Sequence, residues 1–258
     1  MAGSPIRFSD GAGYELLMGQ WTRDVGAIFL EWLQPSEELA WLDVGCGIGA
    51  FSSLVLECCM PRSLLGIDPS EAQLDFARGR GLEPVATFRN GDAMRIDLAD
   101  HSVDVAVAAL VVHFMPDPLR GVTEMSRVVR PGGLVAAYAW DLETGGFPYE
   151  AVHGAMRASG LEAPAPPHPE AGNADELIRL WQAAGLDDVR QREISVTRLF
   201  RDFDHYWQTA TLSPRIAAVL GDLPPDQLAS VQHETKGRIS SPLAVTARAN
   251  AVSGRVSG

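Results

Sequence analysis

Leu42-Asp43-Val44-Gly45-Cys46-Gly47-Ile48-Gly49-Ala50 is the stretch that decides the fold, because it joins an apolar run to three glycines at alternate positions. The run 39–44 predicts a buried strand and 50–59 a helix, so the glycines fall in the turn between them. Glycine suits a backbone that turns sharply and approaches a ligand with no Cβ in the way. The helix that follows presents free N–H groups to whatever binds there. The stretch therefore predicts a ligand site rather than a glycine-rich turn without one.

Strands and helices continue to alternate after this turn. We predict strands at 64–67, 85–89, 103–110 and 134–140, and helices at 70–78 and 119–129. The strand at 103–110 is apolar on both faces, as expected in the middle of a parallel sheet. The alternation predicts a doubly wound α/β fold with helices on both faces of the sheet. Its strand ends meet at one edge, where ligands bind.

The two ends of the chain add further helices. Apolar residues recur at helical spacing over 14–34, ahead of the first strand. After residue 141 the pattern loosens. We expect a Pro-rich surface loop at 162–170, a helix at 175–184, a strand at 188–197, helices over 203–232, and a half-buried closing strand at 242–253.

Composition excludes several classes of function. The 258 residues carry a formal net charge of −12, and nucleic-acid binding relies on Lys and Arg neutralising phosphates. The longest apolar run, 105–112, is too short to span a bilayer, and residues 1–20 lack the pattern of a secretion signal. The three cysteines and six histidines show no metal-ligand spacing. We therefore expect a cytoplasmic protein with no nucleic-acid partner, no membrane insertion and no metal.

Three acidic residues follow or end successive predicted strands. Asp43 precedes the first glycine, Asp68 ends the second strand, and Asp92 follows the third. A carboxylate at Asp43 suits a ligand that carries an ammonium and a sulfonium, and is awkward beside a pyrophosphate. Asp92 can accept a hydrogen bond from an adenine amino group. The glycine turn also satisfies the dinucleotide fingerprint. Dinucleotides and sulfonium ligands both use an acid such as Asp68 on their ribose hydroxyls. Neither the glycine turn nor Asp68 therefore distinguishes a dinucleotide from a sulfonium ligand.

Four motifs together resemble the class I S-adenosylmethionine-dependent methyltransferases, the group that includes small-molecule and quinone methyltransferases. They are the glycine motif at 43–49, the ribose motif at 66–70, the adenine-side motif at 91–93 and the turn at 130–133. The resemblance implies a Rossmann-like, seven-stranded sheet with an antiparallel strand near its end. It implies S-adenosylmethionine as cofactor, with S-adenosylhomocysteine as product. The expected cofactor contacts are Asp43, Gly45, Gly47, Gly49, Asp68, Pro69, Gly91, Asp92, Ala93 and Leu110.

We accordingly expect one domain over 1–258. N-terminal cap helices at 14–34 precede a cofactor-binding core at 39–141, and substrate-side helices and loops at 142–240 form an insertion before the last strand at 242–253.

Substrate-side residues are harder to identify. His113 follows the fourth strand, where the resemblance places the reactive methyl, and a histidine is a usual general base near neutral pH. A scaffold role for His113 is the competing interpretation. Tyr14, Met18 and Trp21 on the N-terminal helix, and Trp140 at the end of the fifth strand, are candidates for the substrate pocket, although helical spacing also predicts ordinary core packing for the first three.

The sequence therefore predicts a methyltransferase that acts on an O, N or C nucleophile of a small, partly apolar molecule. Two alternatives remain open. One is an NAD-dependent oxidoreductase, which leaves Asp43 and Asp92 unexplained. The other is a non-methylating binding protein or cyclase on the same scaffold, because one fold can host several functions.

Overall fold

A seven-stranded mixed sheet organises the part of the chain that the computed structural model describes, which is residue 13, residues 15–240 and residues 243–258. The strand order is β3-β2-β1-β4-β5-β7-β6. The first five strands along the chain pair in parallel, whereas β7 runs antiparallel to both of its neighbours. The strands are β1 (Ala40–Val44), β2 (Ser63–Asp68), β3 (Ala86–Asn90), β4 (Val103–Ala109), β5 (Val129–Trp140), β6 (Leu186–Leu199) and β7 (Ala244–Val256).

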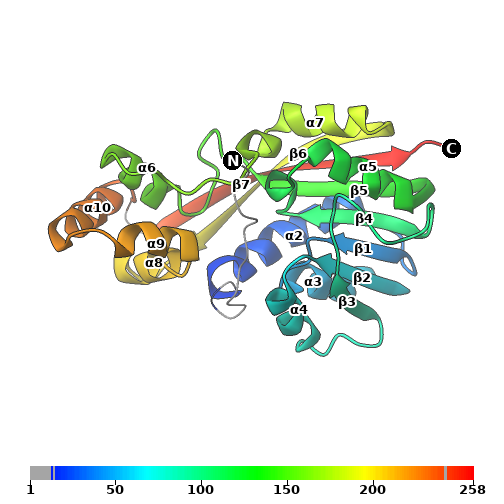
Figure 1. The fold of residues 1–258 in the computed structure, drawn as a ribbon, viewed down its shortest axis with the longest axis horizontal. Helices are drawn as coiled ribbons and strands as arrows, with labels where there is room; N and C mark the ends of the chain where they lie inside the picture. The colour runs from blue at the N-terminus through cyan, green and yellow to red at the C-terminus, as the bar shows by residue number, and fades with distance from the viewer. Residues whose placement is uncertain (1–12, 14, 241–242) are drawn as a thin grey trace.

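Helices cover both faces of the sheet, as the sequence predicted (Figure 1). Before β1 lie the π-helix η1 (Glu15–Gly19) and α2 (Gln20–Leu33). The others are α3 (Ala50–Cys59), α4 (Glu71–Arg78), η2 (Val112–Phe114), α5 (Pro118–Val128), α6 (Glu150–Ala158), η3 (Pro169–Gly172), α7 (Ala174–Ala183), α8 (Phe203–Ala210), α9 (Pro214–Gly221) and α10 (Pro225–Gly237). Helices α2, α3 and α4 lie on one face, and α5 and α7 lie on the other.

Aromatic packing fixes α2 against the sheet. The ring of Phe29 lies 4.9 Å from the ring of Tyr138 on β5 and 6.1 Å from that of Phe51 on α3. On the opposite face, Trp181 of α7 is fully buried and its Nε1 donates to the Val135 carbonyl at 2.9 Å. Burying an aromatic side chain contributes roughly 1.5–3 kcal/mol, so these contacts hold both helix layers in place.

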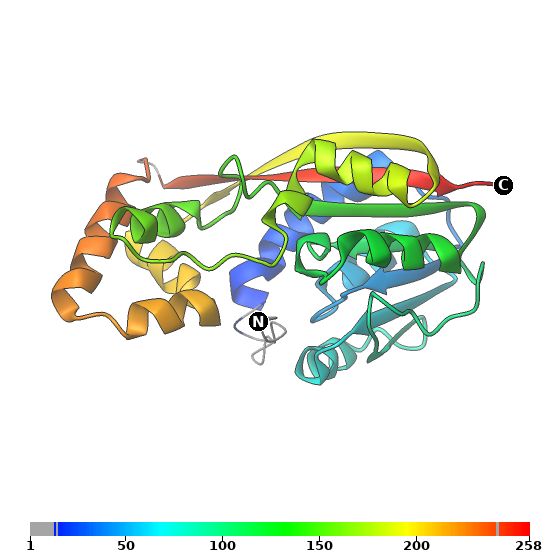
Figure 2. The same ribbon diagram turned by 45° about the horizontal axis from the view of Figure 1, so that its top comes forward.

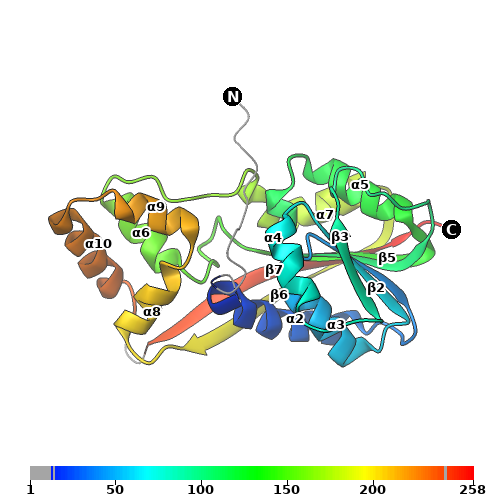
Figure 3. The same ribbon diagram turned by 60° about the horizontal axis from the view of Figure 1, so that its bottom comes forward.

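The last two strands extend beyond the rest of the sheet. Strand β7 pairs with β5 only over residues 249–255, whereas its pairing with β6 continues to Ala244 opposite Leu199. The ends of β6 and β7 therefore form a two-stranded arm. Helices α6, α8, α9 and α10 lie around this arm, to one side of the sheet in all three views (Figures 1, 2 and 3). We call these helices the insertion lobe.

Two predicted strands needed correction. We expected the fifth strand at 134–140, but β5 begins at Val129, which pairs with Val103, while Leu134 pairs with Val105. Residues 130–133 therefore bulge from the ladder, and Gly132 adopts a φ of 75° there. We expected the closing strand to be half-buried. Instead β7 lies between β5 and β6, so residues 249–254 are buried on both faces.

No helix in the described ranges has the length and apolar character required to cross a membrane.

Candidate active site

The glycine turn joins β1 to α3 in backbone conformations that favour glycine. Gly45, Gly47 and Gly49 have φ values of 71°, 53° and 75°. A Cβ at Gly45 would lie 2.6 Å from the side chain of Val111, so this glycine is required by packing as well. A Cβ at Gly47 would meet only Gln73 Oε1, at 3.6 Å. The backbone at Gly47 is thus open to a ligand, as a cofactor cradle requires.

The carboxyl ends of β1, β2 and β3 lie side by side. Val44 is in register with Ile67, and Asp68 with Asn90. Asp43 occupies the position before Val44, and Asp92 comes two residues after Asn90. The acidic series predicted from the sequence therefore lies along one edge of the sheet.

Asp43 is the most perturbed of these acids. Its side chain is buried, and the Ser52 hydroxyl donates to Oδ2 at 2.6 Å. Burial raises its pKa to about 7, and the Ser52 hydrogen bond opposes that shift. Oδ1 is buried without a hydrogen-bond partner among the described residues. An unsatisfied buried acceptor is costly, so it favours a ligand that brings a donor or a positive charge.

Asp68 connects the glycine turn with the start of α4. Its Oδ2 accepts from the Gly47 amide at 3.0 Å, and its Oδ1 accepts from the Ser70 amide at 2.8 Å. Burial raises its pKa, while the two amide bonds lower it. Each carboxylate oxygen can accept a further hydrogen bond, which fits a pair of ribose hydroxyls.

The remaining predicted cofactor residues lie at the same edge. Asp92 is exposed, and its Oδ1 accepts from the Met94 amide at 2.8 Å. Gly91 precedes it and Ala93 follows it, both partly buried. The Pro69 carbonyl accepts from the Asn90 side chain at 3.2 Å, which links the ends of β2 and β3. These positions suit an adenosine lying across the strand ends.

Leu110 adopts a left-handed backbone conformation just past β4. Its φ is 62°, and its amide donates to the Tyr138 carbonyl at 2.8 Å. A non-glycine residue in this conformation is strained by roughly 1 kcal/mol or more, and such strain is concentrated at functional sites. Leu110 also lines a cavity, and so borders both the strand ends and the adjacent space.

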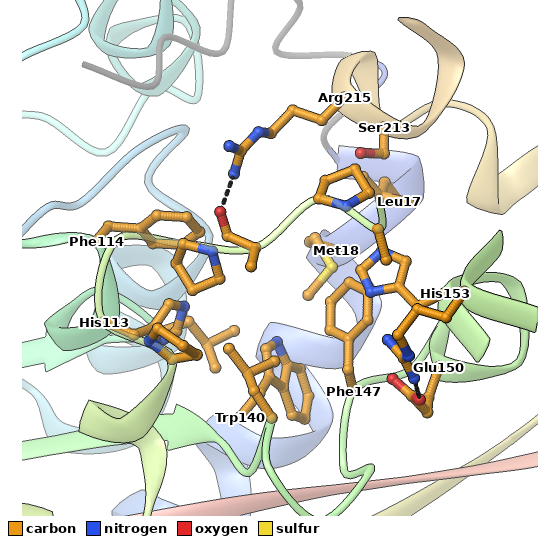
Figure 4. A pocket seen from close by; sticks show the side chains of 18 residues that line it. Leu17, Met18, His113, Phe114, Trp140, Phe147, Glu150, His153, Ser213 and Arg215 are labelled. Carbon is orange, nitrogen blue, oxygen red and sulfur yellow. Dashed lines mark hydrogen bonds and ion pairs between the residues drawn. The ribbon is translucent and has the colours of Figure 1, made fainter. Parts of the chain in front are cut away.

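That cavity, of about 190 Å³, lies between the sheet edge and the insertion lobe (Figure 4). Its walls come from η1, the loop after β4, the end of β5, α6, the Pro-rich segment and α9. The lining residues are Leu17, Met18, Leu110, His113, Phe114, Trp140, Leu142, Phe147, Glu150, His153, Arg157, Ala163, Pro164, Ala165, Pro166, Pro169, Ser213 and Arg215. We refer to it as the central pocket.

His113 contributes a neutral imidazole to the central pocket. The side chain is 2% exposed, and its Nδ1 has no partner among the described residues. Burial lowers its pKa to about 3, so the ring carries no charge near neutral pH. An imidazole with so low a pKa is a weak base, but it can still accept or donate a hydrogen bond.

The predicted pocket residues divide into three cases. Met18 and Trp140 line the central pocket, and Trp140 Nε1 is buried without a partner among the described residues. Trp21 lies behind that wall instead: it is fully buried, its ring meets Trp140 edge to face at 6.4 Å, and its Nε1 donates to the Tyr149 hydroxyl at 3.3 Å. Tyr14 falls outside the described residues.

Two further charged residues near the site, Arg23 and Asp141, have structural contacts. Arg23 forms an exposed ion pair with Glu57 at 2.7 Å. Asp141 is held by Arg248 at 3.2 Å and by the Thr144 amide at 3.2 Å, so it fixes the turn after β5. No group of three potential metal ligands occurs within the described ranges.

Sequence reasoning missed most of the outer wall of the central pocket. The Pro-rich segment is a partly exposed loop, as predicted, but the sequence did not show that its residues 163–166 line the cavity. Glu150, His153 and Arg215 also line it, from helices α6 and α9 of the insertion lobe. No local pattern shows that placement. The proline run was the one available signal of an ordered wall.

Comparison with known proteins identifies a methyltransferase domain in the core of the chain. Residues 42–137 match the family model described as a methyltransferase domain. An uncharacterized methyltransferase of Mycobacterium bovis is 35% identical over 104 residues, which is 40% of this chain and 41% of that protein. The chain thus spans less than half the length of that curated relative.

Solved structures show the same fold over the whole chain. A structure of a methyltransferase complex with the Trm112 activator of Haloferax volcanii matches with a TM-score of 0.62 and 18% identity, covering 96% of this chain and 95% of that one. The cyclase SpnF matches with a TM-score of 0.58 and 21% identity, covering 100% of this chain and 88% of that one. Residues 42–137 of this chain thus match a methyltransferase domain, and the chain shares the fold of these solved structures.

Proposed function

We propose that this chain transfers a methyl group from S-adenosylmethionine to an O, N or C nucleophile of a small, partly apolar molecule bound in the central pocket. The observation that carries the proposal is the position of Leu110. Leu110 lies just past β4, at the edge of the sheet that carries the glycine turn, and it also lines the central pocket. A cofactor along that edge would have its reactive end beside the cavity.

The chain's own residues would bind both ends of the cofactor. Asp68 offers two carboxylate oxygens to the ribose, and Asp43 offers its unpartnered oxygen to a cationic end. When bound, S-adenosylmethionine would supply an electrophilic methyl on its sulfonium to the acceptor's lone pair, with S-adenosylhomocysteine as the other product. Such a displacement depends mainly on how well the nucleophile is placed.

We assign the placing of the nucleophile to His113 and Trp140. Both line the central pocket, and each has a buried ring nitrogen without a protein partner among the described residues. A neutral His113 can accept a hydrogen bond from a substrate hydroxyl or amine, and the Trp140 N–H can donate one. Because burial lowers the His113 pKa to about 3, we propose that this ring orients the acceptor, rather than holding its proton.

Two alternatives make different demands on the same residues. An NAD-dependent oxidoreductase would place a pyrophosphate near the buried Asp43, where a second negative charge is unfavourable. A cyclase would keep the pocket without transferring a methyl, and the likeness to SpnF shows that this scaffold includes such a protein.

The test is methyl transfer itself. Purified protein is incubated with S-adenosylmethionine carrying a radioactive methyl and with fractionated small molecules from bacterial extracts. We expect one or more fractions to acquire label with wild type, and to lose it with Asp68→Ala. Tight binding of S-adenosylhomocysteine without label in any fraction would favour the cyclase or binding protein. Absence of both binding and transfer would refute the proposal.

A further inference from the structure

The ionisable side chains of the central pocket are unevenly distributed. On the side of the sheet edge, the only ionisable side chain in the described lining is that of His113, which is neutral. On the side of the insertion lobe, the lining includes Glu150, His153 and Arg157 of α6, and Arg215 of α9. In Figure 4, Arg215 and Ser213 lie at the top of the view, and His113 and Trp140 lie below. The apolar side chains of Met18, Phe114 and Phe147 fill the walls between them.

Arg215 forms no ion pair within the described part of the chain. Its Nη1 donates to the Ala165 carbonyl at 2.8 Å. By contrast, Arg157 forms an ion pair with Glu150 on the same helix. A partly buried guanidinium whose charge is not balanced is unfavourable in apolar surroundings, so it favours an anion.

His153 responds to the same positive charge. Its ring stacks on Phe147 with 4.9 Å between centroids. Burial, together with the charges of Arg157 and Arg215, lowers its pKa to about 4. The ring is therefore neutral near pH 7, although it lies beside two arginines.

The charge balance of the described lining then amounts to one positive charge. Glu150 cancels Arg157, both histidines are neutral, and Arg215 remains. This contrasts with a net charge of −12 for the whole chain. One uncompensated guanidinium matches a monoanion better than a phosphate dianion, and its planar fork fits a carboxylate.

We propose that Arg215 binds a carboxylate of the substrate, so that the methyl acceptor is a monoanionic molecule whose apolar body spans the central pocket. This inference rests on the proposed function and names the substrate class of the same site. The Ser213 hydroxyl, close to Arg215 in the chain, lines the pocket too and can donate a second hydrogen bond. The carboxylate is the recognition group, and the nucleophile lies towards His113.

The experiment compares acids with their uncharged analogues. Protein loaded with S-adenosylhomocysteine is titrated calorimetrically with cinnamate, 3-phenylpropionate and octanoate, each paired with its own primary amide. We expect at least one acid to bind roughly tenfold to a hundredfold more tightly than its amide, the range for a charge-assisted hydrogen bond. No binding by any of the three acids, or equal binding of acid and amide, would overturn the proposal.

Three variants assign the preference to Arg215. Arg215→Gln should abolish it, and Arg215→Lys should retain part of it because the charge remains while the planar fork is lost. Arg201→Gln is the control, because it removes the same charge from an exposed residue that does not line the pocket. A preference that survives Arg215→Gln would refute the assignment.

Cofactor binding separates this inference from the proposed function. S-adenosylhomocysteine affinity should be unchanged in Arg215→Gln. Weaker S-adenosylhomocysteine binding in that variant would mean that Arg215 serves the cofactor, which would overturn the carboxylate assignment. If wild type fails to bind S-adenosylhomocysteine, the proposed function falls, and the acid-versus-amide comparison on ligand-free protein still decides whether the pocket selects a carboxylate.

Discussion

Replacing Asp43 by asparagine should make the stability of the ligand-free protein less dependent on pH. The folded-state pKa of Asp43 is raised to about 7, while its unperturbed value is 3.8. Wild type therefore loses stability as the pH rises from about 4 to about 7, because the unfolded chain releases this proton more readily than the folded one. The uncharged amide of the Asp43→Asn variant does not titrate, so the variant has no such loss.

The size of the effect follows from the shift. Each pKa unit corresponds to about 1.4 kcal/mol, so between about pH 5 and about pH 8 the wild type should lose about 3 kcal/mol relative to Asp43→Asn. Costs that do not depend on pH, such as an unpaired amide N–H in the variant, cancel from this difference. Ser52→Ala should shift the wild-type pH window upward, because the Ser52 hydrogen bond lowers the Asp43 pKa.

Urea unfolding of ligand-free wild type and Asp43→Asn at several pH values measures this difference directly. A stability difference that stays constant between about pH 5 and about pH 8 would refute the reasoning. That result would mean that the Asp43 carboxyl is hydrated or paired in solution, and that its Oδ1 does not lack a partner that a cationic ligand would supply.

Other predictions concern the cofactor edge and the pocket. Asp68→Ala should weaken S-adenosylhomocysteine binding at least tenfold by calorimetry, since it deletes two charge-assisted acceptors; unchanged affinity would place the ribose elsewhere. His113→Ala should slow methyl transfer while cofactor affinity stays the same, and an unaltered rate would make His113 a scaffold residue. Arg80→Met removes the ion pair with Glu15 and the 2.5 Å bond to the Ile48 carbonyl, which together tie η1 to the glycine turn. It should speed S-adenosylhomocysteine release in stopped-flow measurements at a stability cost within about 1 kcal/mol, and equal release rates would show that η1 does not restrain the cofactor.

The sheet and the cofactor edge were predictable because their signals are local. The glycines at 45–49 indicate the left-handed backbone conformation of their own turn. The apolar segments around this turn predict the alternating order of strands and helices. Asp43 and Asp68 then lie at one edge because parallel strands present their carboxyl ends together.

The substrate side was not predictable, because its residues meet through long-range packing. Arg215 lies on α9, between β6 and β7, and His153 lies on α6, so both line one pocket with His113 only through the packing of the insertion lobe. Trp21 was a pocket candidate because it lies on the N-terminal helix, whereas its helical spacing predicted the core packing that the structure shows. Strand β7 was similarly assigned one exposed face, because its sequence does not show that it enters between β5 and β6.

Cofactor choice is the central claim, and thermal unfolding with S-adenosylhomocysteine or with NADH tests it most directly. At a hundredfold excess over Kd, a true ligand adds about 2.7 kcal/mol, which raises the unfolding midpoint of a protein of this size by roughly 5 to 10 °C. We predict that rise with S-adenosylhomocysteine and none with NADH. A rise with NADH alone would mean that the glycine turn binds a dinucleotide, and that Asp43, Asp68 and Asp92 do not form an S-adenosylmethionine site.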